Sequence, residues 1–228
     1  MILDEMLEEL SFELKRRKVI NLCVGPSYTT AILDDQSMGI SITLTDGEVE
    51  EAGELQGKSA YEVARNLDTP MRRSVSLAVM NALSPPQLSP GDPLQHFQGG
   101  KLCVFGYSPQ VSYEGFSEVV AYDFSPQPVQ GSRPFSSFNG EICTTATIFG
   151  SSLVINAIDK IVSNIKAQHL LLVGVASVYA PVTLKRLGFE VVGKIVPTDR
   201  ARAFRTVCEG GSARQLNRYV SKAYVKLA

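Results

Sequence analysis

KLCVFGYSP, residues 101–109, is an apolar strand that ends in a turn of small residues. The same pattern recurs in ICTTATIFGSS, residues 142–152, and in LLLVGVAS, residues 170–177. In an open parallel sheet the carboxyl ends of the strands line the ligand crevice, and glycine or serine there lets backbone N–H groups approach a bound group. The three strands therefore predict a sheet that holds a small molecule at one edge.

Composition and charge limit the class of protein. The chain has 228 residues, 44% hydrophobic and 20% charged, which suits a globular protein of two modest domains. Its net charge of −1 gives no general attraction to polyanions, so nucleic acid is not an expected partner. No apolar run reaches the roughly 20 residues that cross a bilayer, and the acidic start is unlike a signal peptide. We therefore expect a cytoplasmic protein with no membrane partner.

The cysteines and histidines do not form a recognisable metal motif. Cys23, Cys103 and Cys143 lie inside apolar, strand-like runs, so we expect buried free thiols in preference to two disulfides. Neither C-x-x-C nor paired histidines occur, and His96 and His169 stand apart. A preformed Cys/His metal site is therefore not expected.

The first half of the chain, residues 1–95, is predicted to be an α+β domain. Apolar residues recur on one face of a helix over residues 2–17, and this face could also serve a homodimer. Three β-branched runs follow without intervening helices, which predicts an antiparallel meander over 19–24, 28–33 and 39–44. Two further helices are expected at 59–66 and 71–83.

The second half, residues 96–228, is predicted to be a Rossmann-like domain. A segment rich in proline and glycine, residues 84–100, marks the boundary. Apolar runs at 102–105, 118–123, 142–149, 170–173 and 190–192 alternate with helical segments at 151–165 and 181–187, which predicts a parallel sheet covered on both faces. A last helix is expected over 213–227, and the long connection 125–137 is typical of a functional loop or lid.

Two of the turns carry residues that suit ligand contact. Asp123 follows Gly106 by 17 residues, close to where dinucleotide folds hold a ribose with a carboxylate, although the full G-x-G-x-x-G motif is absent. Asp123 could equally cap a strand. Gly150, Ser151 and Ser152 precede a helix and could bind a phosphate or carboxylate, or simply cap that helix.

Two further polar positions have a functional and a structural interpretation. Asn81 stands on an otherwise apolar helix, where it could reach a ligand or be a core amide bonded to backbone. Asp199, with Arg200 and Arg202, could meet a charged ligand or form a solvated ion-pair cluster. Neither a G-x-S-x-G elbow nor a Walker A sequence is present, so no catalytic residue or reaction is assigned.

These residues, in this order, resemble the uncharacterised family of heavy-metal-chelation proteins. Asn81-Ala82-Leu83 is similar to the family's Asn-Ala-Leu helix end, Gly106-Tyr107-Ser108-Pro109 to its Gly-His-Phe-Pro turn, and Gly150-Ser151-Ser152-Leu153-Val154 to its Gly-Ser/Thr-Thr-Leu-Val turn. The chain departs from the family where Val175-Ala176 replaces its Pro-Ser. The resemblance implies an enolase-N-terminal-like domain before a Rossmann-like domain, a site between them, and a role in metal chelation or in handling a metal-binding metabolite.

The sequence thus predicts an α/β protein that binds a small anionic or metal-chelating metabolite in an interdomain crevice. With only oxygen donors expected there, a metal ion should be hard or arrive already chelated. Two alternatives stay open: a nucleotide- or S-adenosylmethionine-dependent transferase, and a non-catalytic sensor or carrier. The predicted ligand-binding residues are Asn81, Gly106, Ser108, Asp123, Gly150, Ser151, Ser152, Gly174, Ser177 and Asp199.

Overall fold

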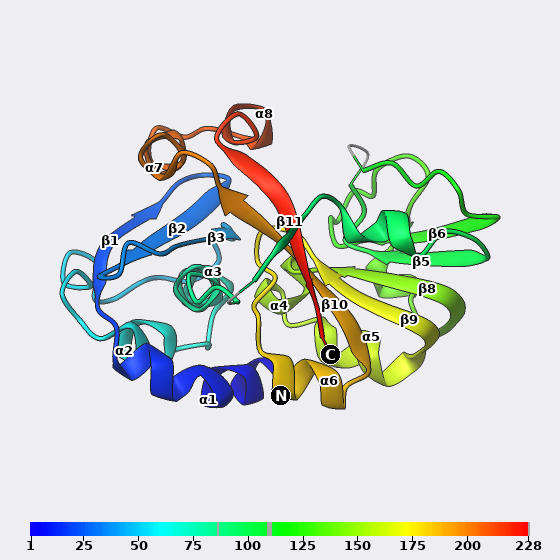
Figure 1. Cartoon of the computed structure of the whole chain (residues 1–228), viewed down its shortest axis with the longest axis horizontal. Helices are drawn as coiled ribbons and strands as arrows, with labels where there is room; N and C mark the ends of the chain where they lie inside the picture. The colour runs from blue at the N-terminus through cyan, green and yellow to red at the C-terminus, as the bar shows by residue number, and fades with distance from the viewer. Residues whose placement is uncertain (86, 109–110, 228) are drawn as a thin grey trace.

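The chain forms two β-sheets flanked by helices (Figure 1). The structure is a computed structural model that describes residues 1–85, 87–108 and 111–227. Pro86 of the predicted boundary and Pro109 of the first turn lie outside the described residues. One sheet has three antiparallel strands in the order β1-β2-β3, and the other has the order β4-β11-β10-β9-β8-β5-β6-β7.

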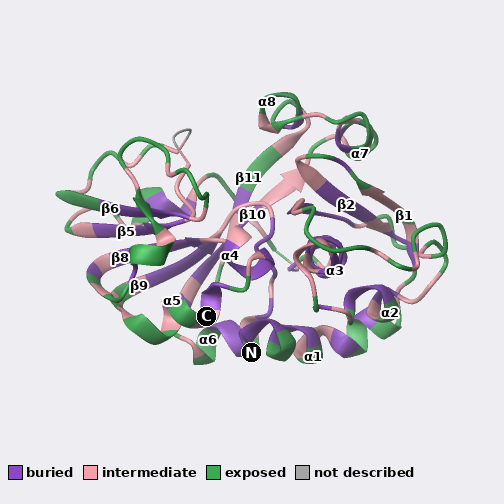
Figure 2. Cartoon of the chain, turned by 180° about the vertical axis from the view of Figure 1, so that it is seen from behind, coloured by how far each residue is buried: buried purple, intermediate pink, exposed green. Residues whose placement is uncertain are grey.

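The small sheet and its helices arise from the first part of the chain, and the predicted meander is confirmed. The elements are α1 (Ile2–Lys15), β1 (Val19–Val24), β2 (Tyr28–Leu33), β3 (Met38–Ile42), α2 (Ala60–Ala64) and α3 (Pro70–Asn81). Helix α1 buries Leu3, Met6 and Leu14 on one face while its other face stays exposed (Figure 2). Gly39 lets β3 lie directly against α3, because a side chain there would collide with the carbonyl of Ala78.

The large sheet is mostly parallel. Its strands are β4 (Ser89–Pro90), β5 (Lys101–Phe105), β6 (Glu118–Asp123), β7 (Arg133–Pro134), β8 (Glu141–Phe149), β9 (Ile165–Val173), β10 (Phe189–Pro197) and β11 (Val220–Lys226). Strands β10, β9, β8, β5, β6 and β7 run parallel, and β11 and β4 pair antiparallel at one edge. The α/β class, with a small antiparallel sheet and a larger mostly parallel one, is confirmed.

The remaining helices differ from the prediction in two of the expected segments, 151–165 and 213–227. They are η1 (Pro93–His96), η2 (Phe135–Ser137), α4 (Ser151–Val154), α5 (Ile158–Asn164), α6 (Pro181–Arg186), α7 (Arg200–Cys208) and α8 (Ala213–Leu216). The helix expected over 151–165 is interrupted at Asn156, which has a φ of 59°, a left-handed conformation that asparagine tolerates better than most residues. Two short helices result.

The predicted last helix over 213–227 is wrong. The helix stops at Leu216, and Val220–Lys226 is a strand that pairs with β10. Basic residues four apart, such as Lys222 and Lys226, suit a helical face, but an even spacing also keeps them on one face of a strand. Pairing with the long β10 decides between the two.

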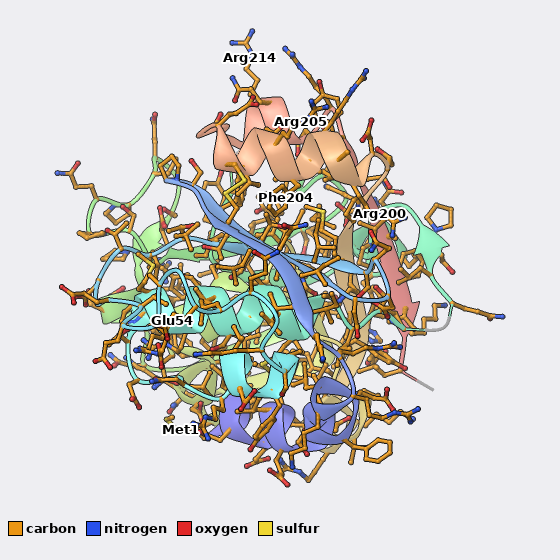
Figure 3. The ribbon with its side chains drawn as sticks, turned by 90° about the vertical axis from the view of Figure 1, so that its left-hand side faces the viewer. Met1, Glu54, Arg200, Phe204, Arg205 and Arg214 are labelled. Atoms are coloured by element: carbon orange, nitrogen blue, oxygen red, sulfur yellow. A yellow bond between two sulfur atoms is a disulfide. The ribbon has the colours of Figure 1, made fainter. Side chains whose placement is uncertain are left out.

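The hairpin of β10 and β11 carries α7 and α8 over to the small sheet (Figure 1). Ala203, Val207 and Leu216 pack there against Met38 and Ile40. Figure 3 shows this helical pair from the side, with Arg214 projecting outward. Helices α7 and α8 therefore cover one face of the small sheet, while α3 covers the other.

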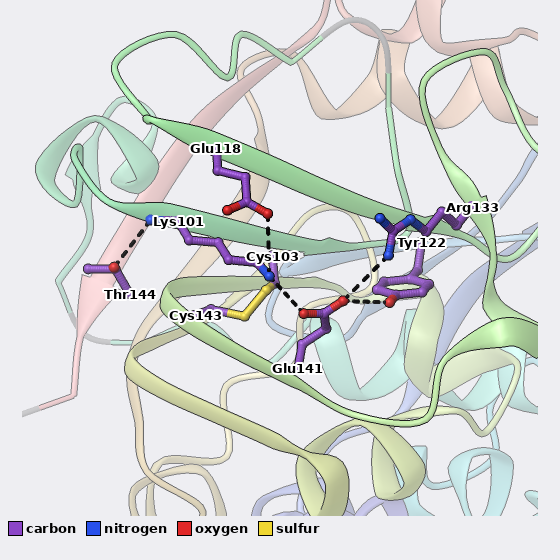
Figure 4. The surroundings of a disulfide bond; sticks show 8 residues. All are labelled: Lys101, Cys103, Glu118, Tyr122, Arg133, Glu141, Cys143 and Thr144. Carbon is purple, nitrogen blue, oxygen red and sulfur yellow. Dashed lines mark hydrogen bonds and ion pairs between the residues drawn. A yellow bond between two sulfur atoms is a disulfide. The ribbon is translucent and has the colours of Figure 1, made fainter.

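The cysteines form two disulfides, so the expectation of free thiols is wrong. Cys103 of β5 is bonded to Cys143 of β8, beside the Lys101–Glu141 ion pair shown in Figure 4, and Cys23 of β1 is bonded to Cys208 of α7. Their Cα atoms are 5.9 and 5.6 Å apart, within normal reach for a disulfide. Each pairing depends on which elements are neighbours in space.

A helix with the length and hydropathy of a membrane span is absent from the part of the chain that the structure describes.

Candidate functional site

The site is built at the carboxyl edge of the large sheet. Strand β5 has β6 on one side and β8 on the other, so the chain reverses its winding direction between β5 and β8. Loops that leave the two strands in opposite directions open a crevice at this point. Gly106 ends β5 and Gly150 ends β8, and a side chain at Gly106 would lie 3.0 Å from the Ser151 hydroxyl.

The turn after β9, residues 174–177, lies against the turn after β8. A side chain at Gly150 would come within 2.6 Å of the Ser177 backbone nitrogen, and the Gly150 N–H donates to the Val173 carbonyl at 2.7 Å. The structure therefore brings together Gly106, Gly150, Ser151 and Ser177.

A cleft of about 330 Å³, the central cleft, lies between the two sheets. Tyr28 and Ile42 of the small sheet face Thr147 of β8 and Gly174 after β9 across it. Of the predicted ligand-binding residues, Ser108 and Gly174 line this cleft.

The central cleft offers several polar groups to a ligand. The hydroxyl of Thr147 is buried and has no hydrogen-bond partner among the described residues. Burial raises the pKa of Tyr28, so its phenol keeps its proton at neutral pH. At the rim, Lys222 pairs with Asp92 at 2.7 Å.

Asn81 is tied into backbone contacts. Its side chain is 2% exposed, and its amide nitrogen donates to the carbonyls of Ile40 at 2.8 Å and Val175 at 2.5 Å. Its side-chain oxygen accepts from Lys194. These contacts match the structural interpretation of Asn81, a core amide that joins α3, β3, β10 and the loop after β9.

Lys194 is the residue that sequence reasoning missed. It lies on β10, is 2% exposed, and belongs to none of the ion pairs among the described residues. Burial lowers the pKa of its ammonium group to about 7. The signal was a single charge in the apolar run Val191–Val196, but the predicted strand ended at Val192 and left this lysine in a loop.

The two predicted carboxylates make local contacts. Asp123 accepts from the backbone N–H groups of Ser125 at 2.9 Å and Val129 at 3.0 Å, one on each oxygen. Asp199 is the N-cap of α7 and accepts from the Arg202 N–H at 3.0 Å. These contacts give both residues a structural role.

The serines at the start of α4 do not cap it. Gly150 is the N-cap, and no side chain satisfies the first N–H groups. The hydroxyls of Ser152 and Ser177 are buried without a hydrogen-bond partner among the described residues. Unpaired buried hydroxyls are uncommon, and they are groups that a ligand or an ordered water could satisfy.

The described residues contain no cluster of three His, Cys, Asp or Glu side chains that could hold a metal ion. His169 is paired with Glu190 at 2.9 Å, and His96 with the Tyr224 hydroxyl at 2.9 Å.

The comparisons agree with this architecture. A crystal structure of a protein of unknown function from the DUF364 family of Desulfitobacterium hafniense is 20% identical, with a TM-score of 0.82 over 99% of this chain and 96% of that chain. A second DUF364 protein, from Pyrococcus horikoshii, is 16% identical, with a TM-score of 0.81 over 99% of this chain and 100% of that chain. At these identities the likeness shows the fold alone.

Sequence families give the same assignment. DUF364, described as "putative heavy-metal chelation", matches residues 90–226, and DUF4213, with the same description, matches residues 7–84. No curated protein matches the chain. The resemblance noted from the sequence is confirmed, and the chain belongs to the DUF364 family.

Proposed function

We propose that the central cleft binds a small anionic or metal-chelating metabolite. The observation that carries this proposal is the position of the cleft. Ligand pockets form preferentially at domain interfaces and at the switch points of α/β sheets. Here the carboxyl ends of β8 and β9 meet Tyr28 and Ile42 of the other sheet across one cavity, so both conditions coincide.

The charges around the central cleft favour an anion. Asp92 is the one carboxylate among its described lining residues, and it is already paired with Lys222. Lys194 and Lys222 give the described lining two basic groups against this one carboxylate. An excess of basic over acidic groups raises the local concentration of an anionic ligand and speeds its capture.

In this proposal the metal ion arrives as part of the ligand, already bound by a chelator. Oxygen-rich chelators bind hard metal ions through several carboxylates or hydroxyls, and such a chelate keeps the character of a small anion. The hydroxyls of Tyr28, Ser108 and Thr147 are suited to hydrogen-bond the outer oxygens of that chelate. This reading agrees with the chelation description of the family.

The transferase alternative gains no support. It rested on Asp123 as a ribose contact, and both oxygens of that carboxylate already accept backbone N–H groups. A sensor or carrier differs from an enzyme in turnover alone. Incubation with a metabolite extract separates the two, because an enzyme consumes a mass that a carrier merely retains.

The proposal is tested by titrating the protein with citrate and with ferric citrate by isothermal calorimetry. Ile42→Trp fills the central cleft and should weaken binding at least about tenfold by steric exclusion. Thr147→Val, which keeps the shape of the side chain and removes its hydroxyl, should cost about 1 kcal/mol of binding. Ile142→Trp is the matched control, since Ile142 is 73% exposed. Unchanged binding in both cleft variants would refute the proposal.

A further inference from the structure

Lys194 is a buried amine without an opposite charge. Taking an ammonium group out of water is costly unless an anion or several hydrogen bonds compensate it. Its contacts are all to uncharged oxygens: the side chain of Asn81 at 2.5 Å, the Asn81 carbonyl at 3.3 Å and the Ser177 carbonyl at 3.4 Å. The surroundings therefore provide hydrogen-bond acceptors but no neutralising charge.

The hydrogen-bond geometry around Lys194 favours its protonated form, whereas burial favours its neutral form. An ammonium group has three hydrogens to donate, and three oxygens stand around the Lys194 nitrogen. A neutral amine would turn its lone pair toward one of them. Yet burial holds the pKa of this amine at about 7, so near neutral pH much of it lacks its proton. An anion beside the nitrogen would remove the conflict.

Lys194 lies in the walls of two cavities, with 2% of its surface exposed. It lines the central cleft and also a second cavity of about 470 Å³, the lateral cleft, together with Asn81 and Arg200. The described lining of the lateral cleft includes no acidic residue. Ser177, whose backbone carbonyl accepts from Lys194, has a hydroxyl that is buried and unpaired among the described residues.

We infer that Lys194 is the residue that pairs with a carboxylate or phosphate group of the ligand, and that it takes up a proton when this oxyanion binds. The inference rests on the proposed function and names one end of its ligand. The two longer contacts, to the carbonyls of Asn81 and Ser177, are the ones an oxyanion would replace. The short contact to the Asn81 side chain keeps the lysine in position.

No neighbouring charge accounts for the lowered pKa of Lys194. Desolvation is the one cause that lowers its pKa. Strand β3 contributes no ionisable side chain. The ionisable residues on the other elements around Lys194 and in the lining of the two clefts are Tyr28 on β2, Arg72 and Arg73 on α3, Asp92 before η1, Lys166 and His169 on β9, Tyr179 in the loop after β9, Glu190 on β10, Arg200 on α7, and Lys222, Tyr224 and Lys226 on β11.

The experiment measures proton uptake directly. Citrate and sulfate, both fully ionised near pH 8, are titrated into the full-length protein by calorimetry in two buffers that differ in ionisation enthalpy. With a free-state pKa of about 7 for Lys194, wild type should take up roughly 0.9 proton per anion near pH 8 with either probe, and roughly 0.1 near pH 6 with sulfate, which stays fully ionised there. The affinity should fall about tenfold per pH unit above pH 7.

Three variants make the result specific to Lys194. Lys194→Met should abolish the proton uptake and weaken binding about tenfold or more. Lys194→Arg keeps a permanent cation and should bind the anion without proton uptake. Lys185→Met removes an exposed lysine on α6 and should behave as wild type. A cooperative thermal melt for each variant checks folding.

Two outcomes contradict the inference and can be told apart. If citrate binds wild type without proton uptake, or if Lys194→Met retains the uptake, Lys194 is not the partner of the anion, while the cleft proposal stands on the effect of Ile42→Trp. If neither probe binds at all, the proposed function fails and this inference fails with it.

Discussion

We expect the buried amine of Lys194 to lower the stability of the protein by an amount that depends on pH. The perturbation is Lys194→Met, which keeps the length of the side chain and removes the ionisable group. In the folded protein the pKa of Lys194 is about 7, against 10.5 in an unfolded chain. A lowered pKa for a cation means that folding discourages protonation, so the buried amine costs stability wherever the unfolded chain is protonated.

The size of this stability cost follows from the difference between the pKa of Lys194 in the folded protein and its pKa in the unfolded chain. At about 1.4 kcal/mol per pKa unit, the cost reaches about 5 kcal/mol at and below pH 7. It declines by up to about 1.4 kcal/mol per pH unit between pH 7 and 10.5 and is absent above that range. Against it, Lys194→Met leaves the Asn81 side-chain oxygen without its donor, a pH-independent loss of about 1 to 3 kcal/mol.

The assay is urea unfolding of wild type and variant from about pH 7 to 9.5. We expect Lys194→Met to be at least as stable as wild type near pH 7, with an advantage that shrinks as the pH rises. Other titrating groups are common to both proteins and cancel in the difference. Lys185→Met, at an exposed site, should show no such trend. A stability difference that does not change with pH would refute the reasoning, because it would mean that the buried amine keeps its ordinary pKa.

Three further predictions concern individual side chains. Asp123→Ala should lower the free energy of unfolding by about 1 to 2 kcal/mol through the lost hydrogen bonds to the Ser125 turn, and should leave citrate affinity unchanged in calorimetry; a large loss of affinity would restore its role as a ligand contact. Cys208→Ser opens the disulfide to Cys23, whose two cysteines are 185 residues apart, and the entropy gained by the unfolded chain should lower the free energy of unfolding by up to about 5 kcal/mol. An unchanged midpoint in denaturant unfolding would show that the bond is absent in solution. Ser152→Ala removes an unpaired buried hydroxyl that does not line the central cleft, so stability should change by less than about 1 kcal/mol and citrate binding should stay as in wild type; weakened binding would place this serine in the site.

The sequence was most informative where the local pattern is strong. An apolar strand followed by glycine and serine predicted the turns at Gly106, Gly150 and Gly174, and the structure gathers these turns at one sheet edge. The antiparallel meander was equally readable, because three β-branched runs with short turns leave few other arrangements. Local signals of this kind depend little on the rest of the chain.

The errors came from contacts between distant parts of the chain. Cys103 meets Cys143 because β5 and β8 are neighbours in the sheet, a strand order that periodicity does not reveal. The helix expected over 213–227 gives way to β11 because β10 offers it a pairing edge. Lys194 looked like a loop residue, and its importance appears only when α3 brings Asn81 against it.

A crystal structure of the protein soaked with ferric citrate, in which anomalous scattering locates the iron, would show whether an anionic ligand binds between the two sheets. We expect an iron peak inside the central cleft, between Tyr28 and Thr147, with a citrate carboxylate directed toward Lys194. Iron bound only outside this cleft, or a cleft left empty under saturating ferric citrate, would show that the ligand does not bind there.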